Sequence, residues 1–367
     1  MRYQFFISIA CALGLSGNTF AAPTVATDIA PLHSLVSQVM QGVGQPTLLI
    51  PAEASPHHYT LRPSEAKALA NADLVFWMGE SYTPWLEKAI HNVAGSAQKV
   101  EILALEDTIT HGYREGATFE SHDHGEEDHG GEEDHGEEHH EEGHHDDKHE
   151  ESGEHHNDEH HKDAHHDNKK EDHHDEHKEG HHSKHEEGEH DDHHDHEGSD
   201  PHAWLDPENA KRWVQHISGA LSKHDPDNAS IYSRNAEKTI ASLNVLIQST
   251  GAKVDALNQP KFIVFHDAYQ YFEKRFGIAA TGSISLGHAQ APSPARIKEI
   301  RDTVKRLGVT CVFTEPQYNS GMVNTVFEGT TVSTIGVMDP LGARIAEGTG
   351  HYQALIEGMV NSLSECQ

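Results

Sequence analysis

Residues 261–277, KFIVFHDAYQYFEKRFG, contain the local pattern that decides the fold. The apolar run 261–265 predicts a buried strand that ends at His266. Asp267 can cap a following helix with aromatic residues on one face, and Gly277 is a typical stop signal at the end of a helix. A strand that leads within a few residues into a helix is the repeating unit of parallel sheets covered by helices.

The same alternation recurs on both sides of this stretch. Further strands are predicted at residues 25–29, 47–50, 73–77, 99–103, 309–314 and 332–337. Helices are predicted to begin near Pro31, Ser64, Pro84, Pro207, Pro226 and Pro294, and a last helix carries apolar residues from Tyr352 to Leu363. The stretch 226–257 has few apolar residues for its length, which is typical of a strut between two lobes. The sequence therefore predicts an α/β fold with two parallel-sheet lobes and a long linking helix.

A His-rich acidic run interrupts this alternation between residues 120 and 199. It contains 25 of the 36 histidines and 33 acidic residues against 6 lysines, and Ala164 is its only hydrophobic residue. Such a segment cannot bury apolar surface, so we expect it to be disordered when nothing is bound. Imidazole and carboxylate groups ligate zinc-like metals, so we interpret the run as an auxiliary metal collector rather than a solvated acidic linker. Its paired histidines are the candidate ligands: His139, His140, His144, His145, His155, His156, His193, His194 and His196.

The first residues indicate export from the cytoplasm. Arg2, an apolar stretch from Phe5 to Leu15 and a small-residue exit at Ala21-Ala22 form a typical signal peptide over residues 1–22. No later stretch is long and apolar enough to span a membrane. The run carries −27 of the net charge of −33, so the remainder is mildly acidic and no basic patch indicates nucleic-acid binding.

Two cysteines remain after the signal peptide, Cys311 and Cys366. In an oxidising compartment an even pair predicts one disulfide. A shared metal site is the alternative, although the cysteines lack the close spacing that is typical of zinc motifs.

Three histidines stand at strand ends or turns, where α/β folds gather their chemistry. They are His57 in the first lobe, His202 in the turn before a helix, and His266 in the second lobe. Asp339 ends another strand and can supply an oxygen. Three imidazoles and one oxygen suit tetrahedral Zn²⁺, whereas a manganese site would carry more oxygen ligands. Each histidine alone could instead be a hydrogen-bonding loop residue, but the coincidence of three favours a metal site in the cleft.

Five motifs give the chain a family resemblance. They are SPHHYTLRPS (55–64), DPHAWLDP (200–207), FHDAYQYFE (265–273), CVFTEPQ (311–317) and MDPLG (338–342). Together they resemble the periplasmic zinc-uptake binding proteins of the ZnuA type, the metal-binding receptors that serve ABC transporters. The resemblance covers nearly all of the mature chain.

The resemblance implies two pseudo-symmetric lobes with zinc between them, bound by His57, His202 and His266. It also implies a disulfide between Cys311 and Cys366. Some members have an acidic residue just before the first histidine, where this chain has Pro56, so the fourth ligand is Asp339 or water. His58 is interpreted as a neighbour of the site. The implied boundaries are a signal peptide at 1–22, a first lobe at 23–225 containing the loop 112–199, a linking helix at 226–257 and a second lobe at 258–367.

The predicted function is a binding cycle without catalysis. A monomeric periplasmic receptor captures Zn²⁺, with the run as collector, and delivers it to an inner-membrane ABC permease. Two alternatives remain open at this point. One is a periplasmic zinc buffer without a transporter. The other is a zinc hydrolase, for which Glu315 is a candidate base by position only, since no HExxH-like motif occurs.

Overall fold

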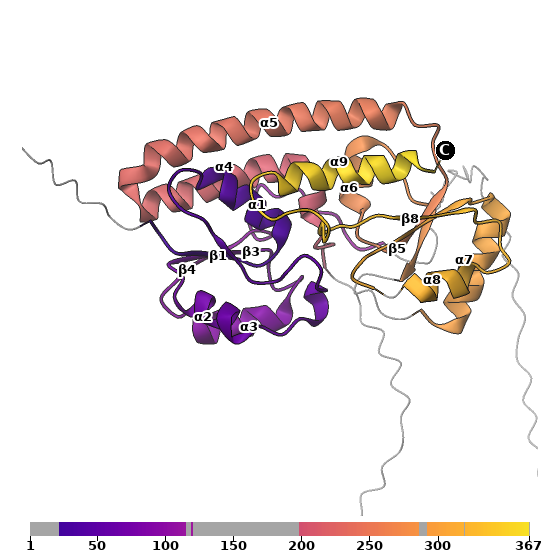
Figure 1. Ribbon diagram of the computed structural model, residues 1–367, viewed down its shortest axis with the longest axis horizontal. Helices are drawn as coiled ribbons and strands as arrows, with labels where there is room; N and C mark the ends of the chain where they lie inside the picture. Colours follow the sequence, from indigo (N-terminus) through magenta and orange to yellow (C-terminus); the bar gives the residue numbers. More distant parts are fainter. Residues whose placement is uncertain (1–21, 115–118, 120–197, 286–291, 319, 367) are drawn as a thin grey trace, which may run out of the picture. The chain divides into compact units, whose positions relative to one another are not determined.

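The computed structural model describes residues 22–114, 119, 198–285, 292–318 and 320–366. Residues 1–21 of the predicted signal peptide and the nine paired histidines of the run lie outside these residues. Figure 1 shows two parallel sheets flanked by helices, which confirms the predicted α/β class. Within the described ranges, no helix combines the length and the apolar character that crossing a bilayer requires.

The first sheet has the strand order β2-β1-β3-β4, with every pairing parallel. Its strands are β1 (Val25–Thr27), β2 (Thr47–Leu48), β3 (Leu74–Trp77) and β4 (Gln98–Glu101). The helices between them are α1 (Ala30–Val39), α2 (Pro63–Ala70) and α3 (Pro84–Val93). Each has a proline at its first or second position. The N–H groups there have no acceptor within the helix, so the missing N–H of proline costs no helical hydrogen bond.

The second sheet has the order β6-β5-β7-β8 and is also parallel. Its strands are β5 (Phe262–His266), β6 (Gly282–Ser285), β7 (Cys311–Thr314) and β8 (Thr334–Val337). Its helices are α6 (Gln270–Phe276), α7 (Pro294–Leu307) and α8 (Ser320–Phe327). The two sheets thus have the same topology. In each, the strand that comes first in the sequence, β1 or β5, lies between the second and third strands.

The sequence did not predict β6 and α8, and it assigned Asp267 a wrong role. Strand β6 contains a single large apolar residue, Ile284, and is defined by its pairing with β5 rather than by a hydrophobic pattern. Helix α6 begins at Gln270 with Tyr269 as its N-cap, so Asp267 does not cap it. The carboxylate of Asp267 instead accepts hydrogen bonds from Arg114.

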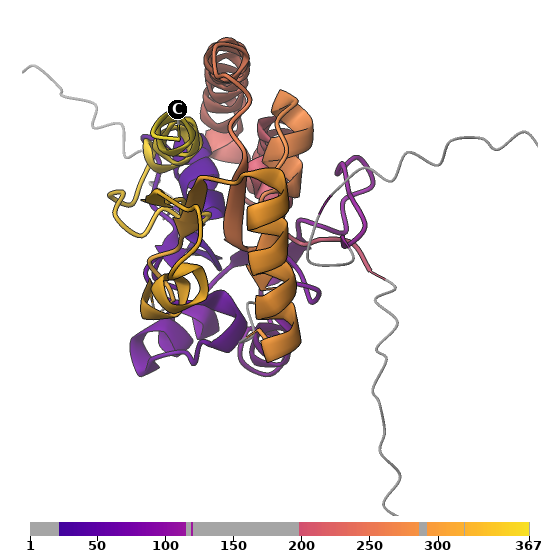
Figure 2. The same ribbon diagram turned by 90° about the vertical axis from the view of Figure 1, so that its right-hand side faces the viewer.

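Three long helices pack together beside the sheets. Helix α4 (Pro207–His224) contacts the 27-residue helix α5 (Ala229–Asp255), and α5 also contacts α1 and the last helix, α9 (His351–Ser364). Both α5 and α9 are seen end-on in Figure 2, so their axes are close to parallel. The buried face of α5 is a narrow stripe that includes Leu243 and Leu246, as expected for a helix with sparse apolar positions.

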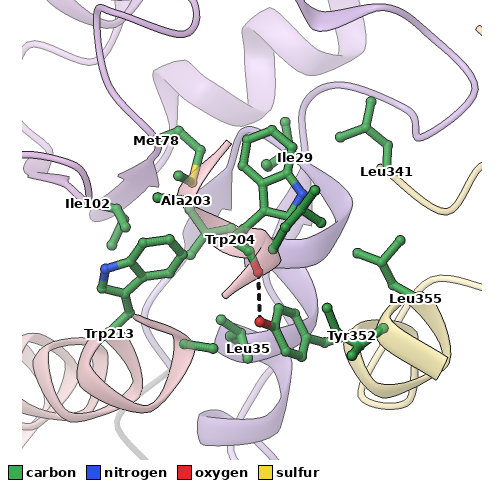
Figure 3. Packing of buried hydrophobic residues seen from close by; sticks show 14 of the residues in the cluster. Ile29, Leu35, Met78, Ile102, Ala203, Trp204, Trp213, Leu341, Tyr352 and Leu355 are labelled. Atoms are coloured by element: carbon green, nitrogen blue, oxygen red, sulfur yellow. Dashed lines mark hydrogen bonds between the residues drawn. The ribbon is translucent and has the colours of Figure 1, made fainter. Parts of the chain in front are cut away.

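The core around Trp204 joins segments that are far apart in the sequence. Its indole is fully buried, and Figure 3 shows Ile29, Leu341, Leu355 and Tyr352 around it. The indole Nε1 donates to the carbonyl of Pro340 at 2.8 Å, and the hydroxyl of Tyr352 donates to the carbonyl of Trp204 at 2.7 Å. This packing fixes the segment that carries His202.

Candidate metal centre

The structure brings His57, His202 and His266 together. One ring nitrogen from each lies within 4.8 Å of the other two, and they form a cluster that we call the histidine triad. His202 and His266 are 1% and 3% exposed, whereas His57 is partly exposed. Three nitrogen donors that converge in this way can hold a metal ion.

His266 is positioned by the second sheet. It is the last residue of β5, and Glu315 directly follows the neighbouring parallel strand β7, so both side chains leave the same edge of the sheet. The Nδ1 atom of His266 lies 2.6 Å from Oε1 of Glu315, and both side chains are buried. A carboxylate on one ring nitrogen fixes the tautomer and turns the other nitrogen toward a metal.

The same carboxylate changes the proton affinity of His266. Burial alone would lower the pKa of this imidazole, because the charged form loses hydration. The charge of Glu315 and its hydrogen bond outweigh burial, with smaller help from Asp267 and Asp200, so the pKa is raised above its ordinary value of 6.5. The metal-free site therefore binds a proton on His266 more readily than a free imidazole does.

His202 is held by Asp200 in the turn before α4. One oxygen of Asp200 accepts from the backbone N–H of His202 at 3.0 Å and lies 2.7 Å from its Nδ1 atom. Asp200 is fixed in turn by Gln270 and Tyr271 of α6. Burial raises the pKa of Asp200 to about 6, although its hydrogen bonds and nearby cations oppose that effect.

His57 comes from the turn Pro56–His58, which follows the first sheet's β2. The indole of Trp85 donates to the carbonyl of Pro56 at 2.7 Å and so anchors the turn to α3. The ring of His57 packs edge-on against Tyr82, with 5.2 Å between ring centroids. His58 is exposed and does not belong to the triad.

The separation of the triad nitrogens suits Zn²⁺. The Nε2 atoms of His202 and His266 lie 3.3 Å apart. In a tetrahedral site with Zn–N bonds of about 2.0–2.1 Å, two ligand nitrogens stand about 3.3–3.4 Å apart. Because the Nδ1 atoms of both rings face carboxylates, the Nε2 atoms are the ones that remain for a metal ion.

Asp339 is not part of this cluster. Its carboxylate accepts from the backbone N–H groups of Leu341, Gly342 and Ala343, and from the side chain of Gln317. These bonds hold the turn after β8. The turn brings Pro340 and Leu341, rather than Asp339, to the wall of the site.

The triad surrounds a small cavity of about 10 Å³, which is room for about one water molecule or ion. Ten described residues line it: Pro56, His57, Tyr82, His202, His266, Glu315, Gln317, Tyr318, Pro340 and Leu341. The walls are largely buried aromatic and aliphatic groups, so a bound cation would be shielded from bulk water.

Several residues of the site have no strong local signal in the sequence. Asp200 lies within the Asp-Pro-His motif, but only the structure shows that it holds His202. The sequence singled out Glu315 only by its position at the end of a strand. Its contact with His266 joins residues 49 positions apart and is visible only in the structure. Arg114 pairs with Asp267 and Glu273 across more than 150 positions, which no local pattern reveals.

Comparison with known proteins places the chain among zinc-uptake proteins. The family described as "Zinc-uptake complex component A periplasmic" matches residues 25–366. The "High-affinity zinc uptake system protein ZnuA" of Brucella abortus is 40% identical over 366 residues, which cover 99% of this chain and 98% of the relative. The protein of the same name from Paracoccus denitrificans is 38% identical over 360 residues, with 98% and 96% covered.

Solved structures share the fold. A crystal structure of ZnuA matches with a TM-score of 0.63 at 19% identity, over 94% of this chain and 99% of that chain. The AdcAII protein of Streptococcus pneumoniae matches with a TM-score of 0.64 at 18% identity, over 95% and 100%. At these identities the likeness concerns the fold alone.

Proposed function

The chain belongs to the family of periplasmic zinc-uptake complex components A, and we propose that it binds Zn²⁺ at the histidine triad and delivers it to an ABC-type zinc importer. It acts as a monomeric receptor in the periplasm, to which the signal peptide at residues 1–22 directs it. The names of the relatives, which are components of zinc uptake systems, support the partner.

The observation that carries the proposal is the pair of Nε2 atoms 3.3 Å apart in a buried cavity. In the tautomer that the carboxylates of Asp200 and Glu315 favour, the protons lie on Nδ1 and the two Nε2 atoms present lone pairs to each other. Two buried lone pairs at this distance repel unless a cation or a proton lies between them. Zn²⁺ satisfies both, and His57 supplies a third nitrogen.

We propose that a water molecule is the fourth ligand. The carboxylate of Asp339 is already committed to three backbone N–H groups, and using it for the metal would leave these donors unpaired. The three imidazoles also favour Zn²⁺ over Mn²⁺, which prefers more oxygen ligands. The indole of Trp204 donates to the carbonyl of Pro340, so the buried core supports one wall of the site.

The His-rich run acts in this proposal as an auxiliary collector that raises the local zinc concentration. The described residues on either side of it support this role, because Gly112 and Ser199 form a β-bridge and the N–H of Asp200 donates to the carbonyl of His111. The segment between Gly112 and Ser199, which contains the run, therefore leaves and rejoins the fold beside Asp200, the residue that holds His202.

Two other functions are less well supported. A hydrolase needs a base that faces a metal-bound water, but Oε1 of Glu315 is bound to Nδ1 of His266. A zinc buffer would need no importer. The match to an uptake component over residues 25–366 favours delivery over storage.

Growth in zinc-poor medium tests the proposed function. A strain without this protein should grow poorly there and recover with excess zinc or with the parent gene. A gene with His57, His202 and His266 all changed to alanine should fail to restore growth, whereas one that lacks residues 120–197 should fail only at the lowest zinc concentrations. Normal growth with the alanine variant would refute delivery through the triad.

Zinc affinity should fall as the pH is lowered, starting above pH 6.5. The pKa of His266 is raised, so protons compete with the metal while an ordinary imidazole would still be neutral. Binding is therefore complete above the raised pKa and is lost as the pH falls through it, by about tenfold per pH unit for each protonated histidine. Competition titrations with a chelator at several pH values measure this. An affinity that is unchanged between about pH 7.5 and about pH 5.5 would contradict histidine ligation.

A further inference from the structure

We propose that Gln317 and Tyr318 form a latch over the mouth of the triad and set the rates at which Zn²⁺ enters and leaves. This inference rests on the proposed function and adds two positioning residues to it. Neither residue contributes a nitrogen or carboxylate to the triad.

The exposure of the lining residues locates the mouth of the cavity. Of the ten described residues that line it, seven are buried. The other three, His57, Gln317 and Tyr318, are partly exposed. His202 and His266 form the closed end. An ion must therefore arrive at His57 and pass Gln317 and Tyr318 to reach the other two ligands.

Hydrogen bonds fasten this segment to the residues just before His57. The hydroxyl of Tyr318 lies 3.2 Å from Oγ of Ser55. The side-chain amide of Gln317 donates to the carbonyl of Ala52 at 3.0 Å. Both bonds join the connection after β7 to the connection before the His57 turn, across more than 260 positions of sequence.

The other side of the segment is anchored on the second sheet. The ring of Tyr318 stacks on Phe265, with 4.8 Å between centroids and 17° between planes. The amide of Gln317 also donates to Asp339 at 2.9 Å. Phe265 precedes the ligand His266, and Glu315, two residues before Gln317, holds that ligand. The segment is thus anchored near His266 and fastened by two bonds near His57.

The size of the cavity makes opening necessary. A cavity of about 10 Å³ accommodates a single small particle and excludes a zinc ion with its water shell. Exchange therefore requires that the mouth widen. The bonds to Ser55 and Ala52 are the described hydrogen bonds that join the two sides of the mouth, so breaking them lets it widen.

Two substitutions loosen the latch without removing its bulk. Tyr318→Phe removes the hydroxyl and keeps the ring on Phe265, and Gln317→Leu removes the amide at similar volume. Tyr59→Phe is the matched control. It also removes a tyrosine hydroxyl two residues from His57, but that hydroxyl donates to Glu65, and Tyr59 does not line the cavity.

The experiment loads the full mature chain with one equivalent of Zn²⁺ and follows release to an excess of chromogenic chelator by stopped flow. Association is measured with the metal-free protein, and affinity by competition. The chain with His57, His202 and His266 changed to alanine shows how much of the measured zinc exchange comes from the His-rich run. Each latch substitution should raise the release rate about threefold, and the pair about tenfold, because each removes one ordinary hydrogen bond across the mouth, to Ser55 or to Ala52. The association rate should rise with it, so that Kd changes by about twofold or less. Tyr59→Phe should leave both rates unchanged.

Three results would overturn the proposal. The first is a double variant that releases and binds zinc at the same rates as the parent. Another is faster release with unchanged association, which would mean that the residues stabilise the bound ion and do not control its passage. If the parent and the triple alanine variant exchange zinc identically, the metal does not use the triad, and the proposed function fails together with the latch. A folded state with unchanged Tm in each variant excludes general damage.

Discussion

Changing His202 to alanine should weaken zinc binding at the triad by on the order of 100- to 1,000-fold. A four-ligand zinc site contributes roughly 10–16 kcal/mol, so the loss of one ligand costs about 3–4 kcal/mol. We choose His202 because it is 1% exposed and two contacts to Asp200 fix the orientation of its ring. Competition calorimetry with the mature chain measures the change.

His58 provides the matched control for this prediction. It stands beside His57 in the same turn, yet it is exposed and outside the triad. His58→Ala should leave the tight site unchanged, while His57→Ala should weaken it. Equal losses from both substitutions would mean that the turn as a whole, rather than one imidazole, binds the metal.

Asp339→Asn separates the two hypotheses for the fourth ligand. If Asp339 holds only the turn after β8, the variant should keep its zinc affinity and lose about 1–3 kcal/mol of stability, since it weakens a partly buried carboxylate that accepts three backbone N–H groups. If affinity falls as far as it does in His202→Ala, Asp339 binds the metal and the proposed water ligand is wrong.

The sequence predicted those parts of the fold that local chemistry controls. Asp206 caps α4 by accepting from the N–H of Glu208, and Ser293 caps α7 by accepting from Arg296. Both helices then have proline at their first position, so a few neighbouring residues suffice to set where they begin. Strands β5 and β7 were equally visible because their apolar runs are buried on both faces.

Features that depend on distant partners could not be predicted. Asp267 has the residue type of a helix cap, but Arg114 bonds its carboxylate from 153 positions away. Strand β6 exists because β5 offers an open edge, and its own residues lack a hydrophobic pattern. The same holds at the site. The positions of three histidines at strand ends or turns predicted the metal site. The residues that orient two of them, Asp200 and Glu315, become apparent only in the folded chain.

Removing the disulfide between Cys311 and Cys366 should lower the free energy of unfolding by about 4 kcal/mol and Tm by roughly 8 °C. The bond joins residues 55 positions apart and so restricts a long loop in the unfolded chain. It also ties the end of α9 to β7. Helix α9 carries Tyr352, which holds Trp204, so the bond supports the core behind His202.

Replacing both cysteines by alanine avoids leaving a free thiol or burying a hydroxyl at Cys311, which is 1% exposed. The parent protein in a phosphine reductant is the matched comparison, and its denaturation curve should coincide with that of the double variant. Neither cysteine contacts a triad histidine, so zinc affinity at 25 °C should stay close to that of the parent while the protein remains folded. A double variant within about 0.5 kcal/mol of the parent would show that packing of α9 on α1 and α5 already holds the helix without the bond.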